Sequence, residues 1–122
     1  EAKHVPNLVV SAGKTYIASR MVGTSSTVMG YMAIGTGTGT PASGDTTLGT
    51  EAGRVSLTAF TSSTNTVTAT ATFPAGTGTG AITEAAILNA ASNGTMLCRT
   101  TFPVVNKAAG DSIAITWVVT VS

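Results

Sequence analysis

The chain has 122 residues, which suits a single domain, and its formal net charge is only +1. No basic stripe supports nucleic-acid binding, and no apolar run approaches the roughly 18 residues that a membrane-spanning helix requires. Charged residues make up 9% of the chain, against roughly 25% in an ordinary globular domain. We therefore expect partners to cover much of the surface; the alternative is a surface coated by Ser and Thr.

The N-terminal residues 1–7 show little apolar patterning, which predicts an extended arm before a single β-rich domain over residues 8–122. Such arms often become ordered only against a neighbouring molecule. The segment also lacks a basic region followed by a long apolar core, so we expect no signal peptide. The candidate partner contacts in this arm are Lys3, His4, Val5 and Pro6.

One helix is predicted over residues 13–22. Ser11 precedes it as the expected N-cap, and Gly23 follows it as a left-handed terminal residue. Ile17 and Met21 are four residues apart, so they lie on one face of this helix. We expect that face to pack on the core.

The remaining apolar segments predict about six strands, because Val, Ile and Thr alternate with turn residues. We expect the second and third to form a hairpin and the last three an antiparallel meander. The predicted architecture is mainly β: an antiparallel sandwich or partly open barrel with one short helix. The predicted strands are residues 28–34, 54–60, 66–73, 85–88, 95–102 and 113–121.

Residues 35–49 form a glycine- and threonine-rich stretch that is too long for a tight turn. Leu48 is its one large apolar residue and is expected to anchor the return of the loop. No Lys follows the glycines, and no helix opens after them, so a phosphate-binding loop is not indicated. The glycines instead favour close backbone approach. The candidate partner contacts in this loop are Gly37, Thr38, Gly39, Thr40 and Pro41.

The carboxylates favour structural roles over catalysis. A small hydrolase would need a pair such as Glu51 and Glu84 across a reacting bond. Ion pairs or turn caps with Arg54, Arg99 or Lys107 are the preferred interpretation. Glu84 and Arg99 in particular are expected to form a structural pair.

One His and one Cys cannot form a metal-ligand cluster. Cys98 lies within a strand pattern and is expected to be a buried thiol. We therefore predict no catalytic residue, no cofactor and no metal, and hence no enzyme.

Four stretches resemble small structural proteins of tailed-bacteriophage virions. They are LVVSAGKTYIASRM at 8–21, YMAIGTGTGTPASGDTTLGTEAGRV at 31–55, ITEAAILNAASNGTMLCRTTF at 82–102 and GDSIAITW at 110–117. The resemblance covers most of the chain, although its motifs are low in complexity. It implies a non-enzymatic head decoration (cement) protein that binds the major capsid protein on the outer capsid lattice.

The resemblance also implies a homo-oligomer, with a trimer as the expected state, made in the host cytoplasm and located on the virion head. Residues 82–89 are similar to segments of tail-fibre and tail-collar proteins as well. Those usually carry Gly and a bulky aromatic where this chain has Ala86 and Leu88. The alternative is therefore a tail or tail-fibre attachment component that contacts other tail proteins or the host surface.

Overall fold

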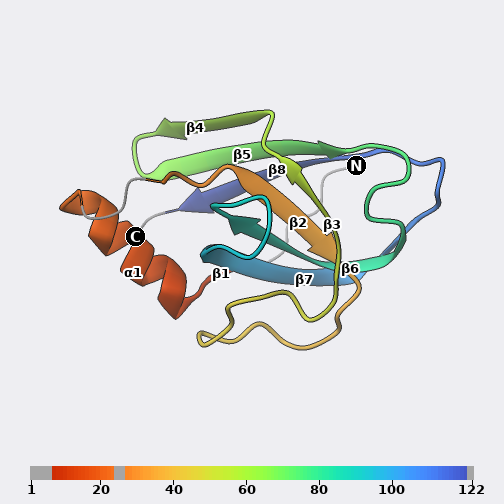
Figure 1. Ribbon diagram of the computed structural model, residues 1–122, viewed down its shortest axis with the longest axis horizontal. Coiled ribbons are helices and arrows are strands. Elements are labelled where there is room, and N and C mark those ends of the chain that lie inside the picture. Colours follow the sequence, from red (N-terminus) through yellow and green to blue (C-terminus); the bar gives the residue numbers. More distant parts are fainter. Residues whose placement is uncertain (1–6, 24–26, 121–122) are drawn as a thin grey trace.

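The computed structural model describes residues 7–23 and 27–120 of the chain. Within these residues the chain forms eight strands and one helix (Figure 1). The elements are β1 (Asn7–Val9), α1 (Ser11–Met21), β2 (Tyr31–Gly35), β3 (Glu51–Ser56), β4 (Ala59–Ser63), β5 (Thr66–Phe73), β6 (Gly80–Leu88), β7 (Met96–Lys107) and β8 (Ile113–Thr120).

In residues 7–23 and 27–120 the strands form two antiparallel sheets and no closed barrel. The five-stranded sheet has the order β1-β7-β6-β2-β3, and the three-stranded sheet has the order β4-β5-β8. In Figure 1 the three-stranded sheet runs along the upper part of the molecule, and α1 lies at one end. The predicted mainly β fold with a single short helix is confirmed for the described residues. The structure has more strands than expected, because β1 is present and the strand predicted at residues 54–60 is divided between β3 and β4.

The main core lies between the two sheets. The inward alternation predicted for β5 and β8 is confirmed, since Phe73 is fully buried and Trp117 nearly so. Met32 and Ile34 of β2 meet them from the five-stranded sheet. Cys98 is also buried there, as predicted, and burial raises the pKa of its thiol to about 12. The thiol therefore stays protonated and inert.

A second apolar cluster covers the opposite face of the five-stranded sheet. Ala33 of β2 and Ala86 of β6 lie side by side in the ladder and contribute to it. Leu48 reaches this cluster from the loop between β2 and β3, which confirms its predicted anchoring role. Both faces of β2 are therefore buried, as its apolar sequence predicted.

The segment 54–60, predicted as one strand, is two strands in different sheets. β3 pairs with β2, whereas β4 pairs with β5. The chain changes sheets at Leu57 and Thr58, whose N–H groups donate to Gly30 and Thr70 respectively. The alternation shifts by one residue at the crossing, because Val55 and Leu57 pack on the core before it and Phe60 packs there after it. Ala59, which the pattern placed on the same face as Val55 and Leu57, is exposed instead. The predicted hairpin therefore starts only at β4.

The predicted final meander is wrong in its last strand. β6 and β7 form the expected hairpin, but β8 pairs with β5 along its whole length. The turn after Lys107 carries the chain to the other sheet. The ammonium of this buried lysine donates to the carbonyls of Pro74 (2.9 Å) and Asp111 (2.7 Å). These bonds join the end of β7 to the connections around the three-stranded sheet.

The helix begins earlier than predicted, and Ser11 is its first residue rather than its N-cap. Val10 occupies the N-cap without a side-chain bond, and the Ser11 N–H donates to the Ser43 carbonyl instead. Gly23 follows the helix with φ +75°, as predicted. Met21 is 81% exposed rather than packed with Ile17, because the helix reaches past the edge of the core.

Candidate functional site

The central feature of the outer face of the five-stranded sheet is the carboxylate of Glu84. Glu84 lies on β6 opposite Gly35 of β2 and is 0% exposed. Its two oxygens accept hydrogen bonds from the backbone N–H groups of Gly37 (2.7 Å), Thr50 (2.8 Å) and Gly49 (2.9 Å). All three donors come from the loop or its junction with β3. The carboxylate therefore holds both ends of the loop together.

Arg99 of β7 neutralises this carboxylate. Its Nη2 lies 2.8 Å from Glu84 Oε1, and its Nε lies 3.3 Å from the same oxygen. The same guanidinium donates to Asp45 Oδ2 (2.9 Å) and to the Gly39 carbonyl (3.1 Å). The expected structural pair between Glu84 and Arg99 is confirmed as a buried ion pair, and Asp45 extends it into the loop.

Gly37 is required where the loop passes the carboxylate. A Cβ at this position would lie 2.5 Å from Glu84 Oε2, closer than real side chains allow. Thr83 adds a further bond, because its hydroxyl donates to the Gly37 carbonyl. The glycine therefore lets its N–H reach the Glu84 carboxylate while its carbonyl accepts from Thr83.

Hydrogen bonds to the loop set the charge state of Glu84. Burial alone would raise the pKa of its carboxyl group. The N–H of Thr50, the Arg99 guanidinium and the N–H groups of Gly49 and Gly37 outweigh burial and lower the pKa below its ordinary value. Glu84 is therefore ionised at neutral pH, which the loop contacts require.

We call residues 36–50 the caged loop, because the Glu84–Arg99 pair closes it over the sheet. Of the predicted contact residues, Thr38, Gly39 and Thr40 are exposed, whereas Gly37 and Pro41 are half-buried. The buried charges of Glu84 and Arg99 thus hold the loop so that its uncharged residues Thr38, Gly39 and Thr40 face the solvent. The other predicted contacts, Lys3, His4, Val5 and Pro6, lie outside the described residues.

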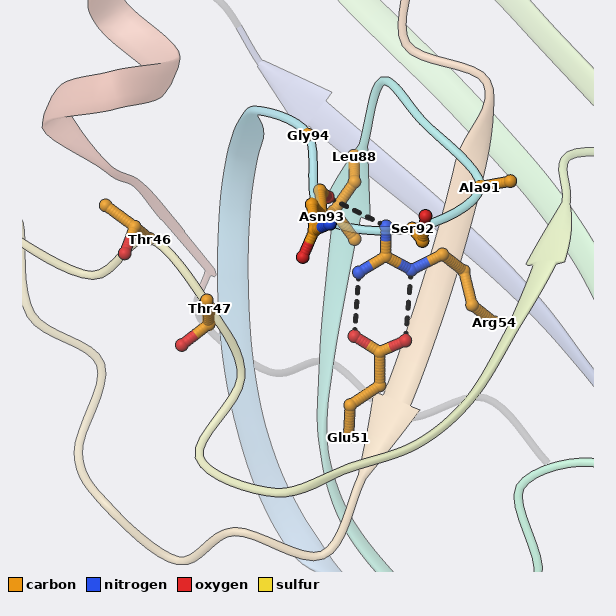
Figure 2. A pocket seen from close by; sticks show the side chains of 9 residues that line it. All are labelled: Thr46, Thr47, Glu51, Arg54, Leu88, Ala91, Ser92, Asn93 and Gly94. Carbon is orange, nitrogen blue, oxygen red and sulfur yellow. Dashed lines mark hydrogen bonds and ion pairs between the residues drawn. The ribbon is translucent and has the colours of Figure 1, made fainter.

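A shallow hollow of about 430 Å³ lies beside the caged loop (Figure 2). Its most polar feature is the ion pair of Arg54 and Glu51, at 2.7 Å. Figure 2 shows the guanidinium between Glu51 and the β6–β7 loop, where Arg54 also donates to the carbonyls of Ala90 (2.8 Å) and Asn93 (2.9 Å). The lining is Thr46, Thr47, Glu51, Arg54, Leu88, Ala91, Ser92, Asn93 and Gly94.

The two carboxylates considered for hydrolysis are both engaged elsewhere. Gly35 separates them in the sheet, with Glu51 on one neighbouring strand and Glu84 on the other. Glu84 has no exposed surface, and Glu51 forms an ion pair with Arg54. Neither carboxylate is placed to share a substrate with the other.

The structural pair of Glu84 and Arg99 was predictable from the sequence, but its closing of a loop was not. An isolated Glu within the apolar stretch of β6 signals a buried partner. Backbone N–H donors give no comparable signal, because every residue except proline carries one.

Two classes of site are not present in the part of the chain that the structure describes. No group of three or more His, Cys, Asp or Glu side chains gathers there as metal ligands. The helical structure in residues 7–23 and 27–120 also lacks the length and apolarity that a membrane crossing demands. Comparisons with protein-family models, with curated proteins and with solved structures find no significant match to this chain.

Proposed function

We propose that this chain is a non-enzymatic virion structural protein that decorates the outer surface of a phage capsid. The observation that carries the proposal is the caged loop. A buried ion pair and three backbone hydrogen bonds hold an uncharged segment in place, with Thr38, Gly39 and Thr40 exposed at its surface. A prefolded loop loses little conformational entropy on binding, which favours its use as a contact surface.

The engagement of the internal carboxylates supports a role without chemistry. Glu84 and Asp45 bind Arg99, and Glu51 binds Arg54. Asp111 accepts the Ala108 N–H at the turn before β8. Each carboxylate thus stabilises a loop or turn, and the two charged residues of the hollow, Glu51 and Arg54, are bonded to each other.

A decoration protein acts through linkage. If it binds only the assembled lattice, it stabilises the shell by mass action, in proportion to its concentration above Kd. A contact surface without charge gives an interaction that depends little on salt. The caged loop supports such a contact, since its exposed residues Thr38, Gly39 and Thr40 carry no ionised group.

The test uses empty shells of the major capsid protein encoded with this chain, to which the purified protein is added. Cosedimentation measures occupancy, and the melting temperature of the shell measures stabilisation. We expect saturable binding that raises this temperature. Thr38→Lys and Thr40→Lys should weaken binding by about tenfold or more, because they place charge in the contact.

Ala109→Lys, in the exposed β7–β8 turn, is the matched control and should bind like the wild type. Circular dichroism and thermal unfolding of every variant verify that the fold is intact. Absence of binding to shells, or binding to isolated tails instead, would contradict the decoration role. Equal binding by the loop variants and the control would show that the caged loop is not the contact.

A further inference from the structure

The outward face of the three-stranded sheet is a regular array of threonines. Because β5 alternates, Val67, Ala69, Ala71 and Phe73 point to the core and the intervening residues point outward. The ladder aligns the neighbouring strands in the same phase. We call this surface the threonine face; it comprises Ala59, Thr61, Ser63, Thr66, Thr68, Thr70, Thr72, Ala114, Thr116, Val118 and Thr120.

The threonine face contains no charged side chain. No Asp, Glu, Lys, Arg or His occurs between Arg54 and Glu84, nor within β8. Most members of the face are exposed, including the Val118 side chain at 52%. A monomer ordinarily places charge on such an exposed surface for solubility. This face carries no such charge.

Threonine hydroxyls make the face complementary to itself. Each hydroxyl is both a donor and an acceptor, so two identical arrays can pair in a two-fold arrangement without unsatisfied groups. The β-branched methyl groups add apolar contact at the same positions, and Thr70 and Thr116 lie opposite each other near the centre. We propose that the threonine face packs against the same face of a second copy of this chain.

A second copy fits this surface better than an unrelated protein does. An ordinary protein surface is rich in charged residues, and these would lose hydration against a face that offers no counter-charge. Another copy brings no such charge. Two-fold packing uses one face from each chain and closes, which gives a dimer in place of the trimer that the family resemblance implies.

The small area of the face favours a weak dimer. The eight residues of β5 span about 26 Å, and three strands span about 14 Å. The flat area is therefore roughly 370 Å² per copy, about half of what a standard interface buries per partner. We expect a weak dimer with a Kd roughly between micromolar and millimolar.

A dimer through the threonine face does not depend on the decoration role, so it can be tested without shells. Sedimentation equilibrium of the purified chain, over roughly 10 μM to 1 mM, should show the mass rising from the monomer value of 12.1 kDa toward twice that value. Thr70→Lys and Thr116→Lys each place like charges across the dimer. Each should weaken association by about tenfold or more. Thr15→Lys, exposed on α1, is the control and should associate like the wild type.

A charge-swap mixture separates a self-interface from a folding defect. Thr70→Lys mixed with Thr70→Glu should associate at least as well as the wild type, although each variant alone does not. A wild-type chain that remains monomeric over the whole range would overturn the proposal. So would Thr70→Lys and Thr116→Lys variants that associate as well as Thr15→Lys.

Discussion

The outer faces of the two sheets differ in how they use charge. The five-stranded sheet concentrates it: Glu84 and Arg99 are buried there, and Asp45 joins them from the caged loop. The three-stranded sheet has no charged residue on any of its strands. The first face is covered by a loop that the charges hold, whereas the second is left as bare threonines. Charged residues therefore shape the outer face of the five-stranded sheet, whereas the outer face of the three-stranded sheet has none to solubilise it.

Removing the charge that closes the loop should have the largest effect. Glu84→Gln leaves Asp45 as the one carboxylate paired with the buried Arg99 cation and should lower the free energy of unfolding by about 3 kcal/mol. Glu51→Gln is the matched control, because Glu51 is 38% exposed and its pair is worth about 1 kcal/mol or less. Urea unfolding of both variants measures the difference. Equal losses would show that the buried pair has no special weight.

Lys107 links the two regions, and its removal should have the next largest effect. Lys107→Met keeps the apolar stem but removes the hydrogen bonds to the carbonyls of Pro74 and Asp111, although Pro74 still accepts the Thr77 N–H. A hydrogen bond donated by a charged group contributes about 1.5–3 kcal/mol. Thermal unfolding should show a clear loss, while Lys14→Met on the exposed face of α1 should change little. A Lys107→Met variant as stable as Lys14→Met would contradict this link.

Gly37→Ala tests how tightly the loop fits the carboxylate. The added methyl group would lie 2.5 Å from Glu84 Oε2, and such overpacking costs about 1–3 kcal/mol. Gly39→Ala is the control, because a Cβ there meets no atom within 4 Å. It should be neutral, or stabilising by a few tenths of a kcal/mol through the unfolded state. Chemical unfolding curves that coincide for the two variants would exclude a tight fit.

The smallest expected effect is the pH dependence that Glu84 contributes. Its folded-state pKa is lowered, so its contribution is complete above the unfolded-state value of about 4.3 and is lost as pH falls through the folded value. The stability gap between the wild type and Glu84→Gln should therefore be full at about pH 7 and shrink below about pH 4. Unfolding free energies across this range measure the gap. A gap that widens in acid would contradict the sign of the shift.

The sequence predicted the local features of both regions well. Alternation in β5 and β8 identified the buried residues, because a period of two depends only on neighbouring positions. The buried thiol of Cys98, the Leu48 anchor and the Glu84–Arg99 pair followed from similar local arguments. The long-range pairing of strands did not.

The errors share one physical cause: the local sequence of a strand does not indicate which other strand it pairs with. Residues 54–60 alternate without a Gly or Pro, so nothing marks the crossing between β3 and β4. The turn before β8 signals a reversal but not the sheet that receives the strand. The closing of the caged loop could not be predicted for the same reason, since backbone donors from both ends of the loop meet Glu84 only after folding.

Native-state hydrogen exchange of three amides tests most directly whether buried charge holds the caged loop in place. In the wild type, the N–H groups of Gly37, Gly49 and Thr50 should exchange as slowly as ladder amides of β6, although they belong to a loop. In Glu84→Gln they should exchange much faster, while the amides of β5 keep their protection. Rapid exchange of these three amides in the wild type, or unchanged protection in the variant, would contradict the account.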